Sequence, residues 1–147
     1  MKIRSIIVVC VGNMCRSPTA EYLLKEKLKG IQVTSAGLMA RKNKSACPKA
    51  IEIAASNGLD ISPHKTRKLT PEMVAQNDLV LAMEAGHTTE ILSVAPFAHG
   101  KVIKFGRWSG DEDIADPYLQ SDAMYQAVFS KLKEQAHNWA NKLDISK

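Results

Sequence analysis

The chain has 147 residues, of which 45% are hydrophobic and 24% are charged, as in an ordinary soluble globular protein. This length predicts one domain over residues 1–147, and no stretch is long and apolar enough to insert into a membrane. The net charge of +5 does not indicate a nucleic-acid-binding protein, because the basic residues are scattered and only 5% of the residues are aromatic. Attraction of an anionic substrate explains the charge equally well.

The cysteine content bears on the compartment in which the protein works. The chain has three cysteines, an odd number that cannot all be paired within it, and nothing in the sequence indicates secretion. We therefore expect a reducing environment and a cytoplasmic protein.

Short apolar segments alternate with segments of helical periodicity along the chain. Strands are expected, in chain order, at Ser5–Val11, Ile31–Ala36, Leu79–Met83 and Lys101–Phe105. Helices are expected at Pro18–Lys29, at Pro48–Asn57, from Thr70 onwards, at Met83–Val94 and at Asp122–Leu143. All strands but the second are apolar without alternation, as expected for parallel strands covered on both faces. This pattern predicts an α/β fold: a three-layer sandwich with a mostly parallel, doubly wound central sheet of about four strands.

The inner faces of the helices follow from the 3.6-residue period. In the first helix we expect them at Ala20, Leu23, Leu24 and Leu28, and in the second at Ile51, Ala54 and Ala55. In the last helix we expect them at Ala127, Val128, Leu132, Ala136, Trp139 and Leu143. Thr70 is expected to cap the third helix, because a proline and a glutamate follow it.

The segment between the first strand and the first helix has the features of an anion-binding loop. Residues 8–18 read VVCVGNMCRSP, in which Ser17 and Pro18 are expected as the N-cap and first residue of the helix. Backbone N–H groups at a helix N-terminus are unpaired and lie at the positive end of the helix dipole. Gly12 permits a left-handed conformation and Asn13 tolerates one, so the loop can curl around a single phosphate-like group. The spacing of a nucleotide P-loop is absent.

Cys10 and Arg16 supply complementary chemistry at the two ends of this loop. The planar guanidinium of Arg16 can bind two oxygens of a phosphate group at once. Cys10, held as a thiolate by this positive environment, is a nucleophile that can attack phosphorus without a metal. Ser17 is near enough in sequence to donate a hydrogen bond to that thiolate. The non-catalytic interpretations are a small buried cysteine that ends a strand, and half of a zinc site with Cys15, for which the sequence holds no second pair of ligands.

The low-molecular-weight protein tyrosine phosphatases have a phosphate-binding signature that resembles VCVGNMCRSPTAE, residues 9–21. Four further segments resemble this family in its own order: TSAGL (34–38), SPHKTRKLT (62–70), DLVLAMEAGH (78–87) and DIADPYLQSD (113–122). The chain is most similar to the bacterial branch that acts with tyrosine autokinases in polysaccharide export, notably through VIKFGRWSGDEDIADPY (102–118).

The resemblance implies an enzyme that hydrolyses phosphotyrosine in proteins through a cysteinyl-phosphate intermediate, with no cofactor and no metal. It implies that Cys10 is the nucleophile, Arg16 the phosphate clamp and Asp116 the acid that protonates the leaving phenolate. The implied phosphate-binding loop contains Val11, Gly12, Asn13, Met14, Cys15 and Ser17. The implied partners are phosphotyrosine proteins, here a membrane tyrosine autokinase that controls capsule or exopolysaccharide export, and phosphate-like oxyanions as inhibitors.

Three more residues receive roles from the resemblance. His64 would brace the loop asparagine, Tyr118 would form an aromatic wall of the substrate cleft, and Arg41 would line the opposite side. The simpler interpretations are a structural histidine, ordinary loop packing and a solvated surface arginine. Leu119 replaces a second tyrosine found in many eukaryotic relatives, and residues 38–44 lack the apolar wall that many relatives have.

Two other functions use a similar loop. Some arsenate reductases share it but relay oxidation through a further cysteine pair late in the chain, whereas Cys47 is the only cysteine beyond the loop here. A redox-sensing, anion-binding module would use Cys10 and Cys15 as a switch, but the carboxyl of Asp116 argues against a pure binder. We expect mild peroxide to join Cys10 to Cys15 reversibly, and we expect Cys47 to take no part in this.

Overall fold

Four parallel strands form the central sheet of the structure, a computed structural model in which residues 2–143 are described. The ends of the expected domain, residues 1 and 144–147, lie outside the described residues. The strands are β1 (Ser5–Cys10), β2 (Gln32–Gly37), β3 (Leu79–Ala82) and β4 (Val102–Lys104), and their order in the sheet is β2-β1-β3-β4. Cys10 is in register with Gly37 of β2, and the preceding Val9 with Ala82 of β3, so these strands end together at one edge.

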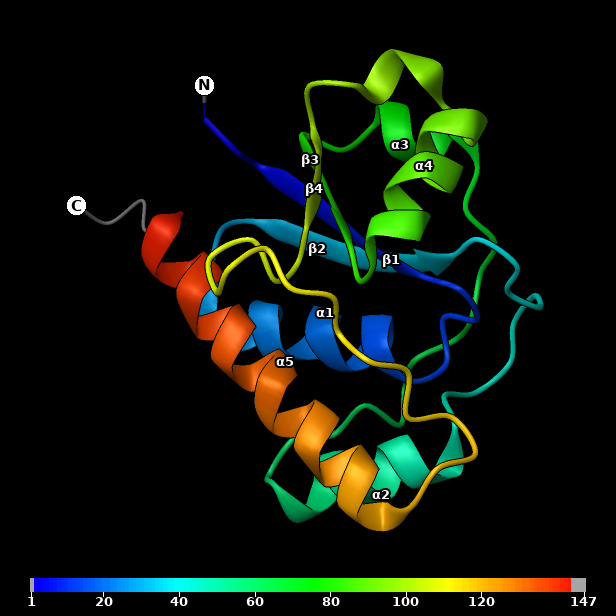
Figure 1. Ribbon diagram of the computed structural model, residues 1–147, viewed down its shortest axis with the longest axis vertical. Helices are drawn as coiled ribbons and strands as arrows, with labels where there is room; N and C mark the ends of the chain where they lie inside the picture. Colours follow the sequence, from blue (N-terminus) through cyan, green and yellow to red (C-terminus); the bar gives the residue numbers. More distant parts are fainter. Residues whose placement is uncertain (1, 144–147) are drawn as a thin grey trace.

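Helices cover both faces of this sheet (Figure 1). On one face lie α1 (Arg16–Lys27) and α5 (Asp122–Lys142), with α2 (Pro48–Ser56) beyond them. On the other face lie α3 (Pro71–Ala75), α4 (Ala85–Val94) and the short 3-10 helix η1 (Pro96–Ala98). The predicted three-layer, doubly wound α/β fold is therefore confirmed. Among residues 2–143, no helix is long and apolar enough to cross a membrane.

The apolar run of β1 explains why the sheet is covered on both faces. Ile6 and Val8 belong to the core that α1 and α5 complete, whereas Ile7 and Val9 belong to the core on the side of α3 and α4. All four side chains are fully buried. Burial of such a side chain contributes roughly 1.5–3 kcal/mol, so β1 anchors both layers.

Two helices begin at positions that differ from the prediction. The first helix, α1, starts at Arg16 and not at Pro18, and Cys15 occupies its N-cap position. Ser17 therefore lies inside the first turn, and its side chain is free for another role. By contrast, α4 starts later than expected, at Ala85.

The inner faces of the helices largely follow the predicted period. The expected positions of α1 are buried, and so are those of α5 except for Ala127, which is exposed, and Leu143, which is half-buried. On α2, Ala55 is exposed. Thr70 caps α3 as predicted, because its side chain accepts a hydrogen bond from the backbone N–H of Met73.

Candidate active site

The loop between β1 and α1 lies at the edge where the strands end, and neighbouring segments hold its backbone. The carbonyl oxygen of Val11 accepts a hydrogen bond from the N–H of Met39 at 2.9 Å. The carbonyl oxygen of Met14 accepts one from the N–H of Cys47, also at 2.9 Å. In the described part of the chain, the N–H groups of residues 12–15 donate no hydrogen bond. Consecutive unpaired N–H groups at a helix N-terminus form a cradle for an anion.

Asn13, and not Gly12, takes the left-handed conformation in this loop. Its φ is 56°, and its side chain is fully buried. Its Nδ2 donates to Ser17 Oγ at 2.8 Å and to Ser35 Oγ at 2.9 Å. Its Oδ1 accepts a hydrogen bond from the N–H of Arg67 at 3.0 Å. These bonds offset the cost of a left-handed conformation in a residue with a side chain, whereas a Cβ at Gly12 would make only ordinary contacts.

His64 lies behind the loop and supports it from the interior. Its Nε2 is 2.8 Å from the main-chain oxygen of Asn13, and burial lowers the pKa of His64 below its usual value. A neutral ring that carries its proton on Nε2 therefore donates to that oxygen. Ser35 donates to Glu21 Oε1 at 2.6 Å, and the same oxygen is 4.0 Å from His64 Nδ1. The sequence analysis missed Ser35 and Glu21, although both lie inside segments that resemble the family.

Cys10 ends β1, and its sulfur faces the first turn of α1. The Sγ of Cys10 is 2.9 Å from Ser17 Oγ, and Cys10 is only 3% exposed. Ser17 Oγ already accepts a hydrogen bond from Asn13 Nδ2, which leaves its own proton for the sulfur. A thiolate cannot donate a hydrogen bond, so Ser17 is the donor whenever Cys10 is deprotonated.

Arg16 extends from the start of α1 toward the segment that follows β4. Its Nη1 donates to Glu84 Oε2 at 2.5 Å and to the main-chain oxygen of Ile114 at 2.8 Å. Its Nη2 is 3.7 Å from Asp116 Oδ2. The Arg16 side chain is 3% exposed, so these groups fix the guanidinium rather than leave it in solvent. The sequence analysis missed Glu84, which follows β3 at the same edge of the sheet as the loop.

One open pocket brings the candidate residues together. It is lined by Cys10, Arg16, Asp116 and Tyr118 and by four other residues of the loop, namely Val11, Gly12, Met14 and Cys15. Asp116 is half-exposed, and its Oδ1 accepts a hydrogen bond from the N–H of Tyr118 at 3.1 Å. Among residues 2–143, no group of three or more His, Cys, Asp or Glu side chains is placed to hold a metal ion.

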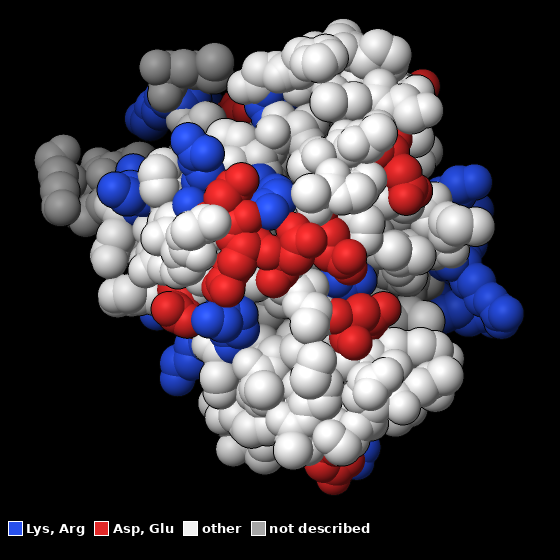
Figure 2. All heavy atoms as spheres, viewed as in Figure 1, with Lys and Arg blue, Asp and Glu red and all other residues white. Residues whose placement is uncertain are grey.

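Arg41 does not line this pocket, contrary to the expectation from the sequence. It belongs to a basic ribbon, residues 41–45 and 65–68, which is closed by an antiparallel bridge between Ser45 and Lys65. The exposed cations of the ribbon have no ion pair within the described residues; they are Arg41, Lys42, Lys44, Lys65 and Lys68. Figure 2 shows acidic side chains gathered in the centre of the face in view and basic ones toward both its left-hand and right-hand edges.

Comparisons with known proteins identify the family of the chain. Residues 5–147 match the family described as low molecular weight phosphotyrosine protein phosphatase. The chain belongs to this family. Among its relatives, the low molecular weight protein-tyrosine-phosphatase Etp of Escherichia coli strain K12 is 40% identical over 143 residues, which is 97% of each chain. The resemblance drawn from the motifs is therefore confirmed.

Solved structures of this phosphatase family share the fold closely. Vibrio vulnificus Wzb in complex with benzylphosphonate has a TM-score of 0.93 at 41% identity and covers 96% of this chain and 99% of its own. The YwlE arginine phosphatase from Geobacillus stearothermophilus has a TM-score of 0.92 at 34% identity and covers 97% of this chain and 94% of its own. Relatives with nearly the same fold thus carry names that refer to different phosphorylated residues, and the fold alone does not select the substrate.

Proposed function

We propose that the protein hydrolyses phosphotyrosine in proteins through a cysteinyl-phosphate intermediate. The observation that carries this proposal is that Cys10, Arg16 and Asp116 line one pocket. They supply a nucleophile, a two-pronged ligand for phosphate oxygens and a proton donor. These groups suffice for the reaction without a cofactor or a metal.

The reaction has two steps, and Asp116 acts in both. In the first, the Cys10 thiolate attacks phosphorus, the bond from phosphorus to the tyrosine oxygen breaks, and Asp116 gives its proton to the departing phenolate. In the second, water attacks the cysteinyl phosphate while Asp116 takes a proton from it, and phosphate leaves as the thiolate is restored. The half-exposed position of Asp116 gives water access for the second step.

The loop and Arg16 stabilise the charge of the transferring phosphoryl group. Gly12, Met14, Cys15 and Arg16 line the pocket, where their N–H groups and the fork of Arg16 can hold the phosphoryl oxygens. Glu84 keeps the guanidinium in place without lining the pocket itself. Phosphate-like oxyanions bind the same cradle and inhibit the enzyme.

The depth of the pocket selects phosphotyrosine. Cys10 is 3% exposed, so the phosphate must reach it on a long, flat side chain, and a phosphoserine is too short. Tyr118 is 49% exposed and offers an aromatic face to the aryl ring, a contact that contributes about 1 kcal/mol. The complex of Vibrio vulnificus Wzb with benzylphosphonate, an aryl ligand, supports this choice.

We further propose that the substrate is a membrane tyrosine autokinase that controls capsule or exopolysaccharide export, and that the protein acts in the cytoplasm. Similarity to Etp and to Wzb, which is 41% identical over 139 residues in Salmonella typhimurium, supports this pathway. The basic ribbon supports it too, because unpaired cations attract acidic residues beside a phosphotyrosine. The odd number of cysteines is typical of a reducing compartment.

The decisive experiment is hydrolysis of an aryl phosphate in the presence of EDTA by the wild type, Cys10→Ser and Arg16→Lys. We expect Cys10→Ser to fold and bind vanadate but to lose turnover, because a hydroxyl stays protonated where the thiol ionises. We expect Arg16→Lys to fail as well, because a point charge cannot replace the two-pronged contact. Near-wild-type rates in Cys10→Ser would show that the nucleophile is another residue.

Matched peptides test the choice of phosphorylated residue. We expect kcat/KM to be much higher for phosphotyrosine than for phosphoserine or phosphoarginine in the same peptide. Comparable values for any two of these peptides would contradict the selectivity, although not the cysteine mechanism. Arsenate separates the rival function, because a reductase would oxidise its own thiols on arsenate whereas a phosphatase leaves them reduced.

A further inference from the structure

Two buried thiols outside the proposed phosphatase chemistry share one tyrosine hydroxyl. Cys15 precedes α1 and Cys47 precedes α2, and a backbone hydrogen bond from the N–H of Cys47 to Met14 joins the two segments. The Oη of Tyr125, on α5, is 3.9 Å from the sulfur of Cys15 and 3.3 Å from that of Cys47. The two cysteines are 9% and 7% exposed, respectively. The fold therefore places the thiol that the sequence analysis set aside next to a thiol of the catalytic loop.

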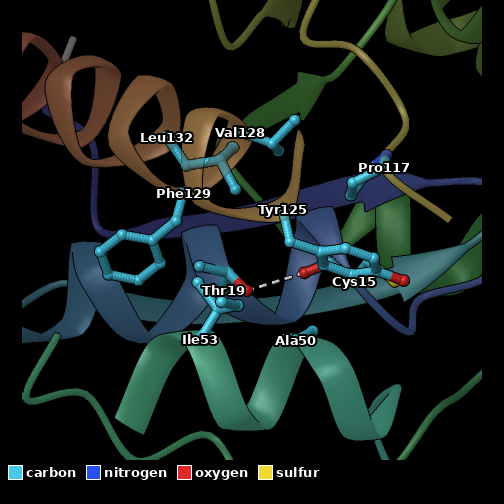
Figure 3. Close-up of a pocket in the computed structure, with 9 residues that line it drawn as sticks. All are labelled: Cys15, Thr19, Ala50, Ile53, Pro117, Tyr125, Val128, Phe129 and Leu132. Carbon is cyan, nitrogen blue, oxygen red and sulfur yellow. Dashed lines mark hydrogen bonds between the residues drawn. The ribbon is translucent and has the colours of Figure 1, made fainter. Parts of the chain in front are cut away.

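Cys15 belongs both to this thiol pair and to the wall of the catalytic pocket. It lines the catalytic pocket together with Cys10, and it also lines a small apolar pocket between α1, α2 and α5. Figure 3 shows Cys15 beside Tyr125 in this second pocket, with Pro117 near them. An oxidised Cys10 can therefore react with Cys15, which lines the same pocket. Cys47 can react with Cys15 on the other side, where both thiols lie next to Tyr125.

The two thiols of the pair differ in acidity. Burial raises the pKa of Cys15 well above its usual value, and the neighbouring Cys47 adds to this. Burial alone would also raise the pKa of Cys47, but the Tyr125 hydroxyl 3.3 Å from its sulfur and the backbone N–H groups at the start of α2 favour the thiolate, and the net effect lowers its pKa. Since the thiolate is the attacking form, Cys47 is the nucleophile of the pair and Cys15 the sulfur that it attacks.

We propose that Cys47 is the terminal thiol of an oxidation relay that moves a disulfide from Cys10–Cys15 to Cys15–Cys47 and so frees the catalytic cysteine. The proposal rests on the proposed function only in taking Cys10 as the reactive thiolate. The modification site is the Cys15–Cys47 pair, and the oxidant is hydrogen peroxide or another peroxide.

The relay balances in three steps. The Cys10 thiolate takes one oxygen from hydrogen peroxide and becomes a sulfenic acid, releasing hydroxide. Cys15 loses its proton and attacks the Cys10 sulfur, which expels a second hydroxide and forms the Cys10–Cys15 disulfide. The proton from Cys15 converts one hydroxide to water, and the proton that Cys47 releases when it ionises converts the other. The Cys47 thiolate then attacks the Cys15 sulfur, and Cys10 leaves as a thiolate. Overall, peroxide is reduced to water and the Cys15 and Cys47 thiols are oxidised to a disulfide.

The test oxidises the reduced full chain with one equivalent of hydrogen peroxide, removes the excess, blocks free thiols at set times and maps the disulfides by mass spectrometry. In the wild type we expect a transient Cys10–Cys15 disulfide, then Cys15–Cys47 with Cys10 free, and recovery of aryl phosphate hydrolysis without added reductant. In Cys47→Ser we expect the Cys10–Cys15 disulfide to persist and activity to return only with a reductant. Before oxidation, the two proteins should hydrolyse aryl phosphate equally.

Tyr125→Phe is a matched second variant, because it keeps the ring in the core and removes only the shared hydroxyl. We expect it to form the Cys10–Cys15 disulfide at the wild-type rate and to convert it to Cys15–Cys47 at least several-fold more slowly. A wild-type protein that accumulates only Cys10–Cys15, or a Cys47→Ser protein that recovers as fast as the wild type, would overturn the relay. A failure of the proposed function would show separately, as an untreated wild type that does not hydrolyse aryl phosphate.

Discussion

Replacing Glu84 by Gln would test how firmly its carboxylate holds the guanidinium of Arg16, the proposed phosphate ligand. The Nη1 of Arg16 lies 2.5 Å from Glu84 Oε2, and the Arg16 side chain is only 3% exposed. Its other partners among the described residues are the carbonyl of Ile114 at 2.8 Å and the more distant Asp116 at 3.7 Å. Glutamine keeps the shape of the side chain and removes its charge, so the change isolates the ionic contribution.

The expected loss follows from the exposure of the pair. A hydrogen bond to a charged group contributes about 1.5–3 kcal/mol. Because the Glu84 side chain is 36% exposed and solvent screens it, we expect the lower part of this range, about 1.5–2 kcal/mol. In a chain of this length each kcal/mol corresponds to roughly 2–4 °C, so the Tm should decrease by about 3–8 °C.

The assay is thermal unfolding of the wild type and Glu84→Gln, each with and without inorganic phosphate. Bound phosphate supplies negative charge to Arg16, so we expect phosphate to raise the Tm more in the variant than in the wild type. Glu90→Gln is the matched control, because Glu90 is exposed on α4, the helix that begins directly after Glu84, and makes no hydrogen bond or ion pair with Arg16. If Glu84→Gln melts like the wild type and gains no more from phosphate, the carboxylate does not hold the guanidinium.

Four further predictions follow from the site. Asp116→Asn should slow hydrolysis of phenyl phosphate by about 10²–10⁴-fold but that of nitrophenyl phosphate much less, because only the poorer leaving group needs a proton; equal losses would make Asp116 structural. Tyr118→Ala should raise KM for aryl substrates, and an unchanged KM would remove the ring from the cleft. Arg41→Ala should lower kcat/KM only for acidic peptides and only at low salt, so a salt-independent effect would count against the basic ribbon. Burial lowers the pKa of both His64 and His87, so the folded state prefers them neutral. The free energy of unfolding should therefore fall as the pH drops below about 6.5 toward their folded pKa values. Urea unfolding from pH 7.5 to 5 measures this, and a flat profile would contradict it.

The strand–helix pattern could be predicted because a strand that is buried on both faces is an uninterrupted apolar run in the sequence. The run from Ser5 to Cys10 has no polar alternation, and in the structure its side chains enter both cores. The inner face of α5 was predicted less completely. Ala127 fits the helical period but is exposed. The period predicts which way a side chain points along the helix, but it does not predict whether a neighbouring element covers that position.

The start of α1 shows why a local signal can mislead. Ser17 followed by proline is a good capping pattern, yet the serine hydroxyl contacts the sulfur of Cys10 instead of capping the helix. The cap position falls to Cys15, which makes no side-chain cap. The functional contact overrides the local preference, as is expected where a site needs a specific donor. In the same way, Asn13 takes the strained backbone conformation because its amide is used by three partners around the loop.

Contacts between distant segments could not be predicted from local patterns. Glu84 lies 68 residues from Arg16 along the chain, and the two meet because parallel strands end at one edge of the sheet. This topology was predictable, so an acidic residue two positions after the end of β3 could have been proposed as a partner for the loop. The basic ribbon also joins two clusters that are separate in the sequence, through a bridge between Ser45 and Lys65 that no local pattern encodes.

Cys47 shows both effects, because it lacks the side-chain cap expected at a helix start and contacts a residue far away in the sequence. It occupies the N-cap position of α2 and makes no side-chain cap, although a serine or aspartate there would contribute about 0.5–2 kcal/mol to the helix. Its sulfur instead faces Tyr125, which is 78 residues away, in a cluster that also holds Cys15. A cysteine that weakens a helix start and brings a second thiol to the catalytic loop is better explained by chemistry at the sulfur than by packing alone. The redox test of Cys47→Ser is informative for the same reason, since serine restores the cap while it removes the thiol.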